Sequence, residues 1–484
     1  MIGKIEKLVY YIIIGVMALI LMASLVLCTN VKMLIAAILI VVIGIGVWIF
    51  LKKKKLLQSQ QNEVCEKYGL VKLVVICLVF KSVVLLLNAT PVADYLTYYN
   101  YGNALCETDG VLQFNPLYIA LFTHVFAYPE LLSFIFGIFG NQLYIVVVLN
   151  IIVSTVSVIF VYLIGKELFS LKAAKVISVM WIIFPSETLW NALCMPEPLY
   201  TLLYLVVVYA CIRFHKADKN WKNIAIFALV TGFVLASYNS LRPIGIIVIV
   251  AFVISELIVN LHSVNRYTIT GIIGFVVIFF ALSNMYSNHI EKKVGTKLAG
   301  FTWYNIGVGF DKDTQGLFSE MRFQRLLQNV NELAQTSKTP AVDAQNLEKE
   351  YLLEDIKKYN SVVDILKLYK NKTLVLLGDD HTAVEHLQAS SIQFLYGVDV
   401  KLKNLCDIFY YFMEIMVLIY ILGMFKSGRT ESGVVFIILL TVGFELSHIL
   451  LTEVQGRYHY VMIVNYLLMV GGSCRLFESL EQMK

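Results

Sequence analysis

Residues 70–102 read LVKLVVICLVFKSVVLLLNATPVADYLTYYNYG. The run from Leu70 to Leu87 is long and apolar enough to cross the roughly 30 Å hydrocarbon core of a bilayer as a helix. The polar segment that follows places Asp94 among tyrosines at the end of this span. A carboxylate so close to lipid is costly, so it indicates a functional site.

The composition extends this interpretation to the whole chain. Of its 484 residues, 58% are hydrophobic and 15% charged, and the mean hydropathy is +0.74. Soluble domains carry roughly 25% charged residues, so the sequence predicts an integral membrane protein. The first apolar run, 9–27, is followed at once by another at 33–51. Because no small-residue cleavage site stands out between them, we expect an uncleaved span and not a signal peptide.

Apolar runs predict an all-α polytopic bundle of about 12 transmembrane helices. They lie near 9–28, 33–51, 70–88, 142–164, 173–190, 198–213, 222–239, 243–260, 268–286, 406–425, 432–451 and 458–475. Basic residues concentrate in alternate connections, which by the positive-inside rule places both termini in the cytoplasm of a multi-pass cell-membrane protein. The net charge of +5 follows from this bias and requires no nucleic acid.

The spans and the polar regions divide the chain into four parts. Residues 1–69 form an N-terminal transmembrane hairpin with a basic cytoplasmic loop, and 70–286 form a core module whose first outer loop carries Asp94. Residues 287–405 have mixed charge at helical spacing and predict a small, mostly helical extracytoplasmic domain. Residues 406–484 hold the last transmembrane helices. Within the first outer loop, 115–118 and 122–139 have the apolar-aromatic character of interfacial helices.

Charged and polar side chains from distant parts of the sequence are predicted on one outer rim. They are Asp94, Glu187, Glu197, Arg242, Asp311, Glu453 and Arg457. Several of them have a simpler alternative: Glu187 and Glu197 can cap helices, Arg242 can contact lipid headgroups, and Glu453 can pair with Arg457. Asp311 and Asp313 mimic a DxD motif, but an Asp-capped turn explains them as well.

The rim suits a lipid-linked anionic substrate. Arg242 and Arg457 can hold phosphate oxygens, and Asp94 can take a proton from an attacking hydroxyl as general base. The tyrosines beside Asp94 suit the faces of sugars. Lys81, inside the third span, has three alternatives: snorkelling along an apolar surface, an internal ion pair, or a phosphate contact.

Several short motifs resemble the GT-C superfamily of integral membrane glycosyltransferases. They are Asp94-xxx-Tyr98, Asn115-Pro116-Leu117-Tyr118, the stretch 165–169, Phe184-Pro185 followed by Glu197, Leu241-Arg242-Pro243 and Glu453-xxx-Arg457-Tyr458. The resemblance covers roughly residues 70–475. It is nearest to the protein mannosyltransferase and aminoarabinose transferase group, particularly its relatives in Gram-positive cell-envelope clusters.

The resemblance implies a GT-C-like bundle that moves a sugar from a polyprenyl-phosphate-linked donor to an extracytoplasmic glycan or lipid acceptor, usually with inversion. The acidic residue of the first outer loop maps onto Asp94. The basic residues that hold the lipid phosphate map onto Arg242 and Arg457, with Lys81 as a further candidate. We also expect Tyr98, Glu197 and Glu453 to bind substrate. Many relatives have a second acid beside the first, whereas Asp94 is flanked by Ala93 and Tyr95, so we expect neither a metal nor another cofactor.

Two other functions fit a many-spanned chain with an outer domain. An envelope polysaccharide polymerase or ligase would use a diphosphate-linked oligosaccharide. A twelve-span lipid-sugar transporter or flippase would place its polar groups near the bilayer midplane and would form no new glycosidic bond.

Overall fold

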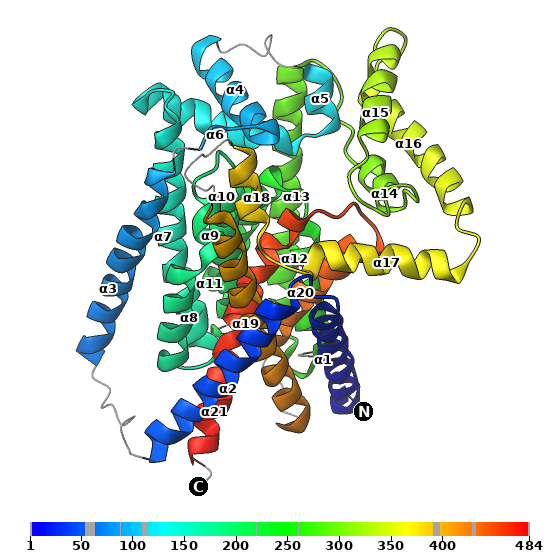
Figure 1. Cartoon of the computed structure of the whole chain (residues 1–484). Coiled ribbons are helices and arrows are strands. Elements are labelled where there is room, and N and C mark those ends of the chain that lie inside the picture. Colours follow the sequence, from blue (N-terminus) through cyan, green and yellow to red (C-terminus); the bar gives the residue numbers. More distant parts are fainter. Residues whose placement is uncertain are drawn as a thin grey trace.

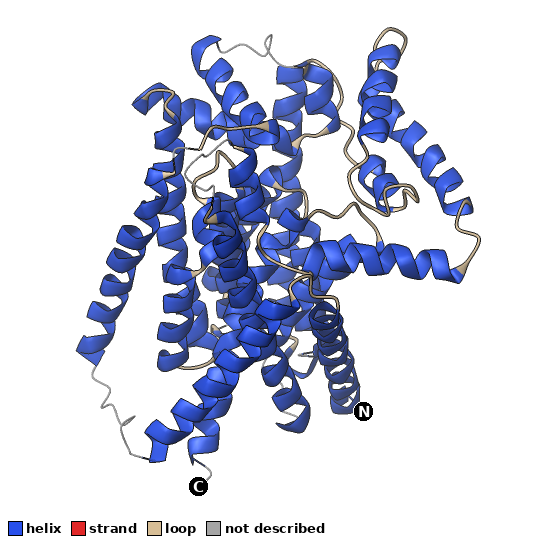
Figure 2. Ribbon diagram, in the orientation of Figure 1, coloured by secondary structure: helices blue, strands red, loops and turns tan. Residues whose placement is uncertain are grey.

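A computed structural model describes residues 2–53, 63–87, 89–108, 115–218, 220–259, 261–390, 397–427 and 432–482. In this part of the chain every regular element is a helix, and Figure 2 shows no strand. The prediction of an all-α fold is therefore confirmed.

Ten of the described helical segments are long and apolar enough to cross a membrane. They are formed by α1 (Ile2–Val26), α2 (Val31–Lys53), α3 (Glu63–Lys81) with its 3-10 extension Ser82–Leu86, α7 (Leu143–Leu168), α10 (Glu197–Lys216), α11 (Trp221–Leu241), α13 (Arg266–Val294), α19 (Asp399–Ser427), α20 (Ser432–Leu450) and α21 (Tyr460–Gln482). Each matches one of the predicted spans.

The two remaining predicted spans are built differently. The run 173–190 is divided into α8 (Leu171–Ile183) and α9 (Pro185–Trp190). Phe184 between them is extended, with ψ 112°, because a residue that precedes proline avoids the helical region. The run 243–260 forms the short helix α12 (Gly245–Ile254), which continues into a π-helical segment at Ser255–Val259.

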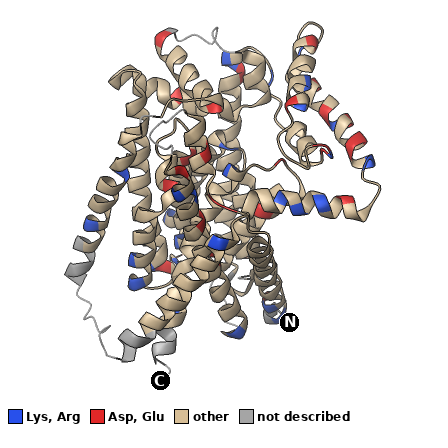
Figure 3. Cartoon of the chain, viewed as in Figure 1, with Lys and Arg blue, Asp and Glu red and all other residues tan. Residues whose placement is uncertain are grey.

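The spanning helices stand side by side, and both ends of the chain lie at the lower end of the bundle in Figure 1. Helix α7 packs against α3, α8 and α10, and α19 packs against α2 and α21. Figure 3 shows Lys and Arg at the lower ends of several helices, at the same end as the termini. This agrees with the alternation of basic connections in the sequence.

Three helices lie over the opposite end of the bundle: α4 (Ala93–Thr108), α5 (Pro116–Leu121) and α6 (His124–Phe139) (Figure 1). Helix α4 packs closely on α6. Gly102 permits this, because a Cβ atom there would lie only 2.8 Å from Leu132 Cβ. The close packing fixes the helix whose first turn carries Asp94.

The polar region between α13 and α19 is helical, as predicted. It contains α14 (Trp303–Gly309), α15 (Glu320–Leu333), α16 (Pro340–Lys357), α17 (Val362–Leu377) and α18 (Thr382–Ala389). Buried Arg322 joins α15 to α16 through Glu348, 2.8 Å away, and Asp355. Asp311 Oδ1 accepts the Asp313 N–H at 2.9 Å, so this pair forms the Asp-capped turn.

Candidate active site

Asp94 lies in the first turn of α4, directly after a strained residue. Ala93 has a φ of +49°, a conformation that is uncommon for a residue other than glycine. Strain of this kind persists where the surrounding structure enforces it, often at functional sites. The amino end of a helix also favours a negative charge, so the backbone here both orients and stabilises the carboxylate.

The partner of Asp94 is Arg457, on the 3-10 turn Gly456–His459 between α20 and α21. Arg457 Nη2 donates to Asp94 Oδ2 at 2.8 Å. Two residues after Arg457, His459 is buried and contacts the Leu376 carbonyl through Nδ1. Its Nε2 lies 3.3 Å from Asp380 Oδ1. The Glu453 N–H, on the same connection, donates to the Asn305 carbonyl at 2.8 Å. The turn that presents Arg457 is therefore held at several points.

A second acid–arginine pair is formed by Glu197 and Arg242. Glu197 begins α10 between Pro196 and Pro198, and its side chain is 2% exposed. Arg242 ends α11 in an extended conformation, as expected for a residue that precedes a proline. The local sequence of both helix ends therefore turns these two side chains toward each other.

The two pairs act on one another electrostatically. Burial alone would raise the pKa of Asp94, but the charge and hydrogen bond of Arg457, together with Arg242 and His124, hold it below its ordinary value. Burial raises the pKa of Tyr98 to about 12. The charge of Arg242 opposes this rise, and that of Glu197 adds to it. The site thus gathers two carboxylates, two guanidinium groups and a neutral tyrosine.

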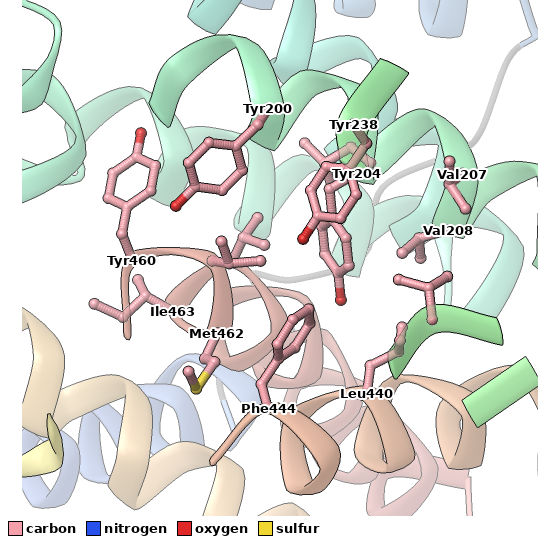
Figure 4. Close-up of a cluster of buried hydrophobic side chains, with 14 of the residues drawn as sticks. Tyr200, Tyr204, Val207, Val208, Tyr238, Leu440, Phe444, Tyr460, Met462 and Ile463 are labelled. Carbon is pink, nitrogen blue, oxygen red and sulfur yellow. The ribbon is translucent and has the colours of Figure 1, made fainter. Parts of the chain in front are cut away.

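Two buried polar atoms of these pairs lack a hydrogen-bond partner among the described residues: Glu197 Oε2 and Arg457 Nε. Buried polar groups are normally satisfied, so these two atoms are available to a ligand. An aromatic layer begins close to these residues in the sequence. Tyr200, one turn after Glu197, faces Tyr460, one residue after the Arg457 turn (Figure 4). The layer continues through Tyr204, Tyr238 and Phe444.

The structure brings together most of the residues that the sequence singled out. Asp94, Tyr98, Glu197, Arg242 and Arg457 lie together at the candidate site. Glu453 lies within electrostatic range of Asp94 and Arg457, but its carboxylate accepts from Gln455 Nε2 at 2.5 Å. Arg457 therefore pairs with Asp94 and not with Glu453, the partner that the simpler alternative gave it.

Lys81 is separate from this group. Its side chain is 0% exposed, and its ammonium forms an ion pair with Glu187. Glu187 Oε1 also accepts from Ser154 Oγ at 2.6 Å, within the bundle. Of the three alternatives for Lys81, the structure shows the internal ion pair. The prediction that Glu187 lies at the rim is wrong, because its side chain is buried in this pair.

Sequence reasoning missed two histidines near the site. His386 Nδ1 lies 2.8 Å from the Tyr95 hydroxyl, and its ring packs against Trp190. His124, the first residue of α6, acts electrostatically on Asp94 and Arg242. Neither belongs to a motif at recognisable spacing, so only the packing of α4, α6 and α18 reveals them.

Among the residues that the structure describes, one group of side chains could hold a metal ion. Ligand atoms of Asp379, His381 and Asp407 lie within 4.8 Å of one another. His381 Nδ1 is 2.9 Å from Asp407 and 3.6 Å from Asp379, and these carboxylates and Glu385 raise the pKa of His381 to about 10 despite its burial. A protonated imidazole therefore supplies the positive charge that the two aspartates need.

Comparison with known proteins supports the class to which this geometry points. Residues 123–285 match the family model described as dolichyl-phosphate-mannose-protein mannosyltransferase. The matched segment runs from α6 into α13 and includes Glu197 and Arg242. It confirms the resemblance to the GT-C superfamily drawn from the sequence, and with the helical bundle it indicates an integral membrane glycosyltransferase.

Two similar solved structures are oligosaccharyltransferases from Archaeoglobus fulgidus. One is the archaeal oligosaccharyltransferase AglB in complex with an inhibitory peptide and a dolichol-phosphate, with 13% identity, a TM-score of 0.45 and coverage of 87% of this chain and 52% of the other. The second, a complex with Zn and sulfate, has 13% identity, a TM-score of 0.47 and coverage of 84% and 49%. The chain thus spans about half the length of these proteins. No curated protein matches it.

Proposed function

We propose that this protein moves a sugar from a polyprenyl-phosphate-linked donor to an extracytoplasmic glycan or lipid acceptor, with Asp94 as the general base. The observation that carries the proposal is the Asp94–Arg457 ion pair beside the Glu197–Arg242 pair at one end of a membrane bundle. It combines a carboxylate that can accept a proton with two arginines that can hold a phosphate.

The reaction needs a base and an anion site close together. The acceptor hydroxyl attacks the anomeric carbon while the bond from that carbon to the phosphate oxygen breaks, and polyprenyl phosphate leaves with the electron pair. Asp94 takes the hydroxyl proton. Arginine suits phosphate because its planar fork can donate two parallel hydrogen bonds. The free Glu197 Oε2 offers an acceptor for a hydroxyl of the sugar.

The ion pair also suggests an order of events. While Arg457 is bound to Asp94, the carboxylate is held at a low pKa and is a weak base. A donor phosphate that engages Arg457 competes for the same guanidinium. Asp94 then loses part of this stabilisation, its pKa rises, and it becomes a better proton acceptor next to the bound donor.

The test is sugar transfer in membranes from a panel of polyprenyl-phosphate sugars. We expect Asp94→Asn to lose roughly 10²- to 10⁴-fold in rate, the usual contribution of a general base. Glu107→Gln is the matched control, because Glu107 is an exposed acid on the same helix. Equal activity of Asp94→Asn and wild type would transfer the role of base to Glu197.

The same panel separates the other functions. Transfer from diphosphate-linked oligosaccharides alone would indicate a polymerase or ligase. Movement of lipid-linked sugar between leaflets without any new glycosidic bond would indicate a transporter, and would overturn the proposal.

A further inference from the structure

Helix α17 differs from the other helices of the polar region in its direction. In Figure 1 it lies across the bundle, whereas the membrane-spanning helices run from end to end. Its carboxyl end joins the bundle, where Leu376 and Leu377 pack with Ile20 of α1 and Ile449 of α20. The Thr29 N–H, in the turn between α1 and α2, donates to the Gly378 carbonyl at 3.0 Å. This end of α17 is therefore level with the ends of membrane spans.

The two sides of α17 differ in character. Leu368, Lys372 and Leu376 are buried and follow one another at helical spacing. On this side Lys372 Nζ donates to the Gly309 carbonyl at 3.2 Å, and Asp364 pairs with Lys312 at 2.9 Å. The side that carries Asp364 and Leu368 thus faces the loop that follows α14.

The opposite side is apolar and exposed. Val362 is 71% exposed and Leu366, one turn later, is 62% exposed. Leu366 and Leu368 are two residues apart and so point about 200° from each other around a helix. The exposed stripe therefore faces away from the polar domain. Lys367 is exposed beside the stripe, and Lys370 is exposed along it, one turn after Leu366. Exposed lysines next to apolar side chains are usual in a helix that lies in a membrane surface.

We propose that the exposed side of α17 rests in the bilayer, among the lipids of the leaflet nearest the candidate active site. Two observations choose lipid as the occupant. Leu377 is eleven positions after Leu366 and so lies on the same side of the helix, and it packs in a cluster with Ile20 of α1 and Ile449 of α20. The exposed lysines of α17 carry the charge that lipid phosphates attract. The contact also supports the site, because the Leu376 carbonyl at the inner end of α17 contacts buried His459, two residues from Arg457.

The proposal can be tested without any activity measurement. A photoreactive benzoylphenylalanine is placed at Leu366 of the full chain in nanodiscs of phosphatidylglycerol and phosphatidylethanolamine, and its adducts are identified by mass spectrometry after illumination. The matched control carries the same group at Gln328, an exposed position on α15. We expect lipid adducts at position 366 at least several-fold above those at 328.

Two outcomes would overturn it: equal lipid adducts at both positions, or adducts at 366 that join two copies of the chain. A second measurement compares Leu366→Glu with Met321→Glu, since Met321 on α15 is similarly exposed at 73%. In nanodiscs, a charge at 366 should lower the melting temperature by several degrees, while a charge at 321 leaves it unchanged. Equal shifts would place Leu366 in water. Both results are independent of whether the protein transfers a sugar.

Discussion

Arg457 Nη2 lies 2.8 Å from Asp94 Oδ2, and this contact joins residues 363 positions apart in the sequence. It links the amino end of α4 to the turn between α20 and α21, so two connections from opposite ends of the sequence meet in a single ion pair. The side chain of Asp94 is 46% exposed and that of Arg457 is 12% exposed. The carboxylate is thus reachable from solvent while its partner is largely enclosed.

The first prediction concerns the pH dependence of transfer. The folded pKa of Asp94 lies below its ordinary value of about 3.9, so the base is ionised throughout the neutral range. The Arg457→Gln variant lacks the charge that lowers the pKa of Asp94, while burial still raises it, so the pKa of Asp94 rises. The acidic limb of the kcat/KM profile should therefore move to higher pH in this variant. A profile measured from pH 4 to 8 tests this, and an acidic limb that stays in place would contradict it.

The same shift predicts a small effect on stability. Because the folded pKa is lowered, the pair contributes stability above the unfolded pKa and loses it as the pH falls through the folded pKa. The contribution is reduced by solvent, because the Asp94 side chain is half exposed. We expect Asp94→Asn to have a nearly normal melting temperature at pH 7, which makes it a suitable variant for the activity test.

The second prediction concerns Arg242. Its replacement by lysine keeps the charge but loses the planar fork, so we expect kcat/KM for the lipid donor to fall roughly 10- to 100-fold, mainly through KM, for a loss of about 1.4 to 2.7 kcal/mol. Arg213→Lys is the matched control, because Arg213 also pairs with a glutamate, Glu167, but is 52% exposed. Steady-state kinetics with the lipid donor measure kcat and KM for both variants. Equal effects of the two substitutions would show that Arg242 does not bind the donor.

The sequence predicted the spans and the rim residues because both depend on local composition. Apolar length identifies a span, and the alternation of basic connections assigns Asp94, Glu197 and Arg242 to one side. Pairing depends on how helices pack. That Arg457 meets Asp94 and not Glu453, four residues before it, follows from the position of α4 over the bundle. Pro185 indicates the break between α8 and α9, but the apolar run continues across it, so its length alone predicts one unbroken span.

The third prediction concerns Lys372, which is 0% exposed. Burial lowers the pKa of Lys372 to about 7, from an unfolded value of about 10.4. The unfolded chain then binds more protons between these values, so the stability of the protein should rise with pH from about 7 to 10. Lys372→Met should remove this rise. Thermal melts between pH 6 and 10 measure it, and parallel curves for the two proteins would contradict it.

The last prediction separates structure from function at Lys81. Breaking a buried ion pair leaves a charge without compensation, so Lys81→Met should destabilise the fold by about 3–5 kcal/mol. Replacing both members of the pair with apolar residues removes that cost, so Lys81→Met/Glu187→Leu should melt near the wild-type temperature. Since the Lys81 ammonium is engaged by Glu187 inside the bundle, the double variant should bind donor and transfer sugar normally per folded molecule. A double variant that is stable but does not bind donor would instead assign Lys81 the phosphate contact.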